Sequence, residues 1–213
     1  MQSMKNIKGL HVLTDREMVK PRTIIEVIEM VIQGGASVIQ LRDKNIVQNE
    51  SIELGKELIR LINGRVPLIV DDNIEVALTI GAQGVHVGQK DMSAKKVRKL
   101  IGSHMILGVS AHTVKQAIKA ETDNADYIGV GPIYRTESKL DAASPIGLSG
   151  LNEIKNAVSI PVIAIGGISI DNAVYVARIA DGIAVISVVL KAKDPKKVTQ
   201  ELAEIIKKYH EQK

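Results

Sequence analysis

The stretch GVHVGQKD, residues 84–91, contains the pattern that decides the fold. It begins with valines around one histidine, as a buried strand does, and then turns polar and ends in Asp91. The preceding apolar run, VPLIVDD at residues 66–72, also ends in acids, Asp71 and Asp72. Two apolar runs that each deliver an acid at the same end indicate parallel strands whose carboxyl ends meet on one side of a sheet.

The same rhythm runs along the whole chain. Amphipathic segments with helical spacing separate eight short apolar runs, at residues 10–14, 37–42, 67–71, 84–88, 105–110, 127–131, 161–166 and 182–187. Eight such units predict an α/β fold, a closed (β/α)8 TIM barrel near the short end of its size range. Since no linker or shift in composition interrupts them, we expect one domain over residues 1–213, with its active site at the C-terminal face of the strands.

Residues two apart in a strand share a face, so alternation predicts which side chains enter the barrel. One face is uniformly aliphatic and is expected to lie under the helices; it comprises Ile39, Leu41, Val85, Val87, Leu107, Val109, Ile128, Val130, Ile163 and Ile165. The other face is small or polar and is expected inside; it comprises Gln40, Arg42, His86, Gly108, Ser110, Gly129, Gly131, Ala164 and Gly166. Burying the charge of Arg42 there without a counter-charge is costly, so we infer an anionic ligand.

Composition narrows the function classes. The chain has no cysteine, which excludes disulfides, thiolate metal sites and cysteine nucleophiles. No apolar run is long enough for a membrane span, and the N-terminal sequence lacks the features of a signal peptide, so we expect a cytoplasmic protein without a membrane partner. The net charge of +4 is concentrated in residues 191–213, which favours a solvated helix face. With four tyrosines and no phenylalanine or tryptophan, base stacking is disfavoured, and we expect no nucleic-acid partner. A homo-oligomer is left open.

The acids at two neighbouring strand ends suggest a metal site. Asp72 and Asp91 would point into one cavity, where two carboxylates without a cation repel each other. Mg²⁺ commonly binds through one or two carboxylates together with substrate phosphates. The sequence leaves open the alternative that these acids cap the helices that follow them.

Three further groups suit anions. In QLRDK, the side chains of Gln40, Arg42 and Lys44 fall on one face and would suit a diphosphate, although a strand end also turns polar on leaving a core. The long loop after the sixth run carries Thr136, Ser138 and Lys139, a set that is also common in exposed loops. Glycines after the seventh run, with VIS at 185–187, favour a phosphate site over a simple tight turn.

At these residues the sequence resembles the thiamine-phosphate synthase family. The likeness extends from about residue 9 to 195 and covers, in order, VIQLRDKN, LIVDDNIEVAL, GAQGVHVGQKDMSAKKVRKLIG, ILGVSAHT, ADYIGVGPIYRTESK, PVIAIGGISIDNA and DGIAVIS. Families of this kind form a (β/α)8 barrel. They join a hydroxymethylpyrimidine diphosphate to a thiazole phosphate, giving thiamine phosphate and pyrophosphate with Mg²⁺ as cofactor, so phosphorylated small molecules are the expected partners.

The resemblance also assigns residues by position. For the pyrimidine diphosphate it implies Gln40, Arg42, Asp43, Lys44, Asp71, Ser110 and Lys139, of which Arg42, Lys44, Ser110 and Lys139 would be catalytic. For the thiazole phosphate it implies Thr136, Glu137, Ser138, Gly167, Ile186 and Ser187, and for Mg²⁺ it implies Asp72 and Asp91.

Two departures from the family pattern stand out. Asp71 occupies a position where the family generally has asparagine, and Ser138 replaces a second threonine but keeps the hydroxyl. A related thiazole tautomerase on the same barrel generally loses the metal acids and carries a histidine where this chain has Pro132. A non-catalytic protein that binds phosphorylated ligands is the alternative from a different functional class.

Overall fold

The eight apolar runs form a closed parallel barrel. The computed structural model describes residues 7–42, 47–136 and 144–210. Its strands, paired in the order β1-β2-β3-β4-β5-β6-β7-β8 with β8 closing on β1, are β1 Gly9–Leu13, β2 Val38–Leu41, β3 Leu68–Asp71, β4 Gly84–Val87, β5 Ile106–Ala111, β6 Tyr127–Val130, β7 Val162–Ile165 and β8 Gly182–Val185. The predicted (β/α)8 TIM barrel is confirmed.

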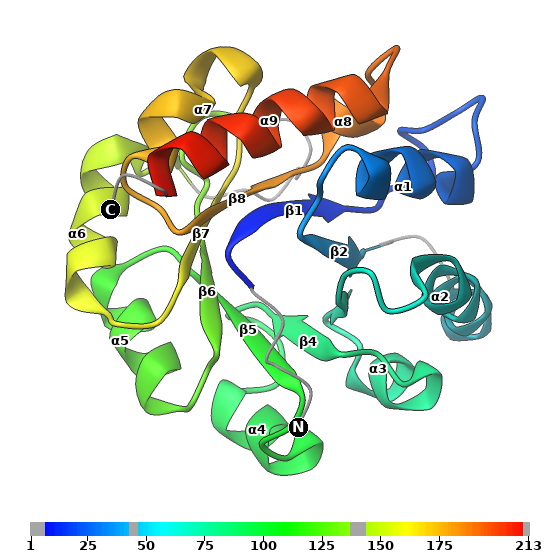
Figure 1. The fold of residues 1–213 in the computed structure, drawn as a ribbon. Coiled ribbons are helices and arrows are strands. Elements are labelled where there is room, and N and C mark those ends of the chain that lie inside the picture. The colour runs from blue at the N-terminus through cyan, green and yellow to red at the C-terminus, as the bar shows by residue number, and fades with distance from the viewer. Residues whose placement is uncertain (1–6, 43–46, 137–143, 211–213) are drawn as a thin grey trace.

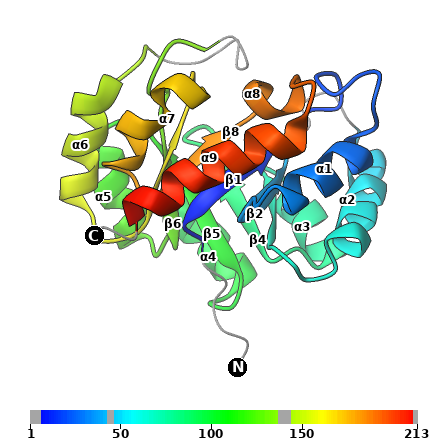
Figure 2. The same ribbon diagram turned by 45° about the horizontal axis from the view of Figure 1, so that its top comes forward.

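Helices surround the strands on the outside (Figure 1). They are α1 Ile24–Gln33, α2 Gln48–Ile62, α3 Ile74–Ile80, α4 Ala94–Ile101, α5 Val114–Thr122, α6 Gly147–Ala157, α7 Ile170–Ala177, the short α8 Ser187–Leu190 and α9 Pro195–His210. Helix α9 packs on α1, α7 and β1 and completes the outer ring (Figure 2). None of the helices in the described ranges has the length and apolar content needed to cross a bilayer.

Local sequence signals explain where individual helices begin. Helix α1 starts at a capping box, in which the Thr23 side chain accepts from the Glu26 N–H and the Glu26 carboxylate accepts from the Thr23 N–H. Helix α5 has the same arrangement between Thr113 and Gln116. Such reciprocal caps satisfy backbone N–H groups that the first helical turn leaves without partners.

Strand alternation predicts the barrel interior correctly except at β7. His86, Ser110 and Gly129 line the interior cavity, as predicted. The prediction for β7 was wrong: Ile163 and Ile165 face inward, and Ala164 packs under the helices. The pairing of β6 with β7 sets Ile163 in register with the inward Gly129, and residues in register on neighbouring strands of a barrel share a face.

An apolar plug fills the interior beneath the cavity. It comprises Leu13, Tyr127, Ile163 and Ala184. His11 is buried there with its ring edge-on to Tyr127, and its Nε2–H donates to the Ile7 carbonyl at 2.6 Å. Burial lowers the pKa of His11 from 6.5 to about 4, with a smaller contribution from His86.

This buried histidine predicts a loss of stability in mild acid. As the pH is lowered from 6.5 to 4, the unfolded chain takes up a proton on His11 that the folded protein does not. The free energy of unfolding therefore decreases as the pH decreases, and His11 accounts for up to about 3 kcal/mol of this loss. Below pH 4 both states are protonated and this loss stops. Denaturant unfolding of wild type and His11→Gln at pH 7 and pH 4 measures the effect.

We expect His11→Gln to lose less stability than wild type over that pH range, because the amide can still donate to the Ile7 carbonyl but does not titrate. The same substitution at exposed His104 controls for loss of an imidazole. Equal losses in wild type and His11→Gln would contradict the assignment.

Candidate active site

A cavity of about 410 Å³ opens at the carboxyl ends of the strands. It brings together the predicted site residues that the structure describes, namely Gln40, Arg42, Asp71, Asp72, Asp91, Ser110, Thr136, Gly167, Ile186 and Ser187. Predictions for Asp43, Lys44, Glu137, Ser138 and Lys139 lie outside the described residues. Side chains that are far apart in the sequence therefore share one concave site at the face where barrel enzymes carry out their chemistry.

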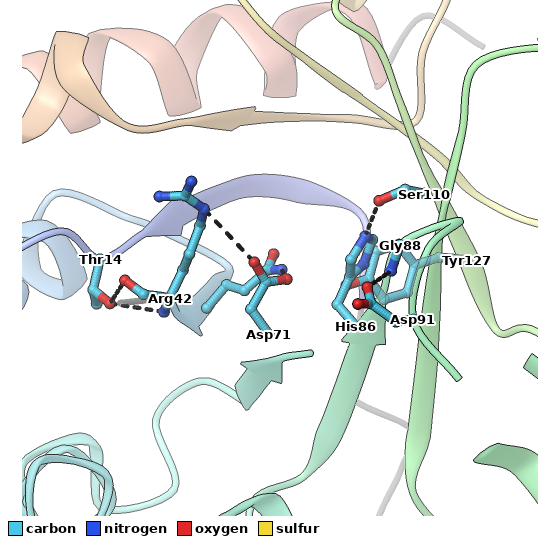
Figure 3. A network of polar contacts seen from close by, with 9 residues as sticks. Thr14, Arg42, Asp71, His86, Gly88, Asp91, Ser110 and Tyr127 are labelled. Carbon is cyan, nitrogen blue, oxygen red and sulfur yellow. Dashed lines mark hydrogen bonds and ion pairs between the residues drawn. The ribbon is translucent and has the colours of Figure 1, made fainter. Parts of the chain in front are cut away.

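The guanidinium of Arg42 places a buried positive charge in this cavity. The residue is only 7% exposed, and its Nε lies 3.7 Å from a carboxylate oxygen of Asp71. This separation exceeds hydrogen-bond length, and the terminal amino groups of the guanidinium point away from Asp71 (Figure 3). The Gln40 amide donates to the other Asp71 oxygen at 2.5 Å. Asp71 thus balances the charge of Arg42 without a fork-to-fork pair, which suits later recognition of an anion.

Thr14 fixes the backbone of Arg42. The buried Thr14 hydroxyl donates to the Arg42 carbonyl at 3.0 Å and accepts from the Arg42 N–H at 2.9 Å (Figure 3). The Thr14 N–H also donates to the Gln40 carbonyl, which continues the β1–β2 ladder beyond the strands. These hydrogen bonds hold the backbone of Arg42 in place, although the residue lies just beyond the end of β2.

The two predicted metal acids lie on the cavity wall at neighbouring strand ends. The Asp72 N–H donates to the carbonyl of His86 on β4 at 2.8 Å, and Asp72 has φ = 61°, a conformation that aspartate tolerates better than most residues. The Asp91 carboxylate accepts from the Gly88 N–H at 2.7 Å (Figure 3). Neither acid occupies a helix N-cap position: the N-cap of α3 is Asn73, which accepts from the Val76 N–H, and that of α4 is Ser93, whose side chain makes no capping bond.

The donor set fits a hard cation that shares its coordination with a ligand. Asp72 and Asp91 are both exposed to the cavity. No group of three or more histidine, aspartate or glutamate side chains suited to hold a metal occurs among the described residues. Two carboxylates alone leave most positions of an octahedral Mg²⁺ to water and phosphate oxygens, which is how this ion is usually bound.

Ser110 is linked to two buried aromatic side chains. Its hydroxyl lies 2.9 Å from His86 Nε2, and His86 Nδ1 lies 2.9 Å from the Tyr127 hydroxyl (Figure 3). Burial raises the pKa of Tyr127 well above 10, and the negative charges of Asp71 and Asp126 raise it further. The phenol is therefore uncharged at physiological pH. The Gln89 side chain also donates to the Ser110 carbonyl at 2.6 Å.

The opposite wall is built from glycines and the start of α8. Gly167 has φ = 64°, and a Cβ there would stand 2.5 Å from the Arg135 carbonyl oxygen, so only glycine fits. Ile186 and Ser187 line the same cavity from the end of β8. Loops after the seventh and eighth strands are the usual phosphate-binding elements of this fold.

Sequence reasoning missed three residues of the site, His11, Thr14 and Tyr127. Tyr127 could have been found, because it alternates with the inward glycines 129 and 131 and is one of only four tyrosines. The role of Thr14 depends on a side-chain contact across β1 and β2 that no local pattern announces.

Comparison with known proteins identifies the family. The family model described as thiamine monophosphate synthase matches residues 10–189. The thiamine-phosphate synthase of Clostridium tetani is 47% identical over 91% of this chain and 93% of its own length, and that of Chloroflexus aurantiacus is 48% identical over 92% of each. The solved thiamine phosphate pyrophosphorylase from Pyrococcus furiosus superimposes with a TM-score of 0.88 at 38% identity, covering 97% of this chain and 99% of that one. The chain therefore belongs to the thiamine monophosphate synthase family.

Proposed function

We propose that this protein is a thiamine-phosphate synthase, a transferase that joins 4-amino-5-hydroxymethyl-2-methylpyrimidine diphosphate to hydroxyethylthiazole phosphate. The observation that carries the proposal is one cavity lined by a buried guanidinium, that of Arg42, and by two carboxylates that follow neighbouring strands, those of Asp72 and Asp91. A cation and metal-binding acids together suit a diphosphate, whereas either alone would suit many ligands.

The diphosphate is assigned to the half of the cavity that runs from the end of β2 to the end of β5. The terminal nitrogens of Arg42 and the hydroxyl of Ser110 would donate to its oxygens. Lys44 and Lys139 are assigned to the same group by resemblance alone. The bond from the pyrimidine methylene carbon to the diphosphate oxygen breaks with its electron pair on pyrophosphate, and the fixed donors stabilise that growing negative charge.

The proposal includes Mg²⁺, held by Asp72 and Asp91 with water and substrate oxygens completing its shell. When bound, the ion would neutralise charge on the diphosphate and on the departing pyrophosphate.

The thiazole phosphate is assigned to the opposite wall, with Gly167, Ile186, Ser187 and Thr136 around its phosphate. Anchoring that phosphate would hold the ring nitrogen near the methylene carbon, where its lone pair forms the new C–N bond. The aminopyrimidine ring can share the positive charge left on that carbon, so we propose a dissociative substitution. No protein nucleophile is required in this scheme.

The proposal also covers the number of domains and the location in the cell. Residues 1–213 are taken as one domain that works in the cytoplasm on small phosphorylated substrates, which agrees with the single closed barrel built by the described residues.

The direct test is product formation from the two substrates, with Mg²⁺ and with excess chelator. Thiamine phosphate is detected after oxidation to its fluorescent derivative, and pyrophosphate is measured in parallel. We expect both products in equal amounts and only with metal. Binding of both substrates by folded protein without turnover would instead favour a non-catalytic protein that binds phosphorylated ligands. The tautomerase reading is disfavoured by Asp72, Asp91 and Arg42, and by proline at position 132 on the cavity wall.

Asp91 provides a test of the metal assignment. In Asp91→Asn the amide oxygen can still accept from the Gly88 N–H, so the turn is kept while the negative charge is lost. We expect Mg²⁺-dependent turnover to fall at least about 100-fold, beyond the loss typical of residues that only support metal ligands, and Asp91→Ala to be at least as inactive. Initial rates over a range of Mg²⁺ concentrations measure this.

Glu75→Gln, which removes an exposed acid from α3, is the matched control for charge and should keep wild-type rates. Near-normal turnover of Asp91→Asn at low Mg²⁺ would remove the metal assignment.

Asp71 provides a test of the departure from the family pattern. Asp71→Asn keeps an acceptor for the Gln40 amide but removes the negative charge beside Arg42. We expect the KM for the pyrimidine diphosphate to stay the same or to fall by up to about tenfold, the equivalent of ~1.4 kcal/mol. Steady-state kinetics at saturating thiazole phosphate measure it. A large rise in KM would show instead that the carboxylate is needed to hold Arg42 in place.

A further inference from the structure

Three neighbouring strands contribute to one chain of hydrogen bonds that ends at the cavity. Tyr127 is the first residue of β6, His86 lies within β4, and Ser110 lies near the end of β5. Tyr127 is 1% exposed and His86 8%, whereas Ser110 is partly exposed at the cavity wall. The chain thus runs from the buried interior to the position assigned to the diphosphate.

The direction of the hydrogen bonds follows from Tyr127. Among the described residues, the Tyr127 hydroxyl has one hydrogen-bond partner, His86 Nδ1. If Nδ1 carried a proton and donated, the O–H of a fully buried phenol would have no acceptor, and an unmade buried hydrogen bond is costly. Tyr127 therefore donates and Nδ1 accepts, which places the imidazole proton on Nε2.

The tautomer of His86 then determines what Ser110 can offer a ligand. Nε2–H donates to the Ser110 oxygen at 2.9 Å, so the serine proton is not drawn toward the histidine. No acceptor for this proton occurs within the described parts of the chain, and the hydroxyl lies on the cavity wall. With the opposite tautomer, Ser110 would donate to His86 and would present only lone pairs, which repel an anion.

We propose that Tyr127 and His86 are positioning residues that make the Ser110 hydroxyl a hydrogen-bond donor toward the diphosphate, an inference that rests on the proposed function. Neither residue needs to touch the substrate. They act on diphosphate binding by setting the direction in which the Ser110 hydroxyl proton points.

The barrel leaves room for this chain of contacts at two glycines. A Cβ on Gly108 would stand 2.4 Å from both His86 Nδ1 and the Tyr127 hydroxyl oxygen, on top of their hydrogen bond. A Cβ on Gly129 would stand 2.9 Å from His86 Cε1. Side chains of the usual size at these inward positions would displace the pair, so the local sequence of β5 and β6 is matched to it.

A double-mutant cycle separates positioning through Ser110 from a general structural effect. The variants are Tyr127→Phe, which keeps the ring but removes the donor, Ser110→Ala, and the two combined. The probe is inorganic pyrophosphate, titrated calorimetrically in the presence of Mg²⁺. We expect each single variant to raise the Kd roughly tenfold, as for loss of a hydrogen bond to a charged group, and the double variant to bind no more weakly than Ser110→Ala.

Kinetics give a second readout of the same variants. Tyr127→Phe should raise the KM for the pyrimidine diphosphate and leave the KM for the thiazole phosphate unchanged. Tyr175→Phe, which removes a phenol from the exposed side of α7, is the matched control and should change neither. Multiplicative effects in the double variant, no effect of Tyr127→Phe, or no binding of pyrophosphate by wild type would overturn the proposal.

The tautomer can also be measured on unmodified protein, which covers the case that Tyr127→Phe does not fold. Long-range ¹H–¹⁵N correlation of the five histidine rings should show His86 protonated at Nε2 and bare at Nδ1. A proton on Nδ1 would overturn the proposal. If the double-mutant cycle and the tautomer are as expected but no thiamine phosphate forms, the proposed reaction is refuted. The Tyr127–His86–Ser110 chain of hydrogen bonds would then still stand as part of a diphosphate-binding site.

Discussion

The burial of the Arg42 guanidinium at the end of β2 is the constraint around which the site is organised. A charge with 7% exposure must be compensated, and Asp71 on the next strand does so from 3.7 Å. Thr14, which follows the neighbouring strand β1, holds the backbone of Arg42 through two hydrogen bonds. Because the compensation is loose, the terminal nitrogens remain directed away from Asp71 and can serve a second, stronger anion.

The barrel separates stability from chemistry along its axis. Leu13, Tyr127 and Ile163 close the interior below the cavity, and the polar groups follow at the carboxyl ends of the strands. Parallel pairing of β3 with β4 is what brings Asp72 and Asp91 to one wall, since each acid follows the end of its own strand. Tyr127 belongs to both parts, because its ring packs in the plug while its hydroxyl reaches His86.

Much of this arrangement could be predicted from sequence. The eight-fold alternation gives the barrel, and parallel strands require the acids to meet. The error at β7 has a physical cause: hydrophobicity alone does not tell whether Ile163 lies under a helix or inside the barrel, and the register of β7 with the inward Gly129 of β6 decides it. The contacts of Thr14 and the direction of the Tyr127–His86–Ser110 hydrogen bonds depend on side chains from different strands, so no single segment encodes them.

In this scheme Arg42 and Ser110 bind the diphosphate, and Asp72 and Asp91 bind the Mg²⁺ that the same diphosphate contacts. A crystal structure of the protein with pyrophosphate and Mg²⁺ tests it most directly. We predict the anion in the cavity against the terminal nitrogens of Arg42 and the hydroxyl of Ser110, with the cation between it and the carboxylates of Asp72 and Asp91. Pyrophosphate bound elsewhere, or a cation that contacts neither acid while the anion occupies the cavity, would contradict the account.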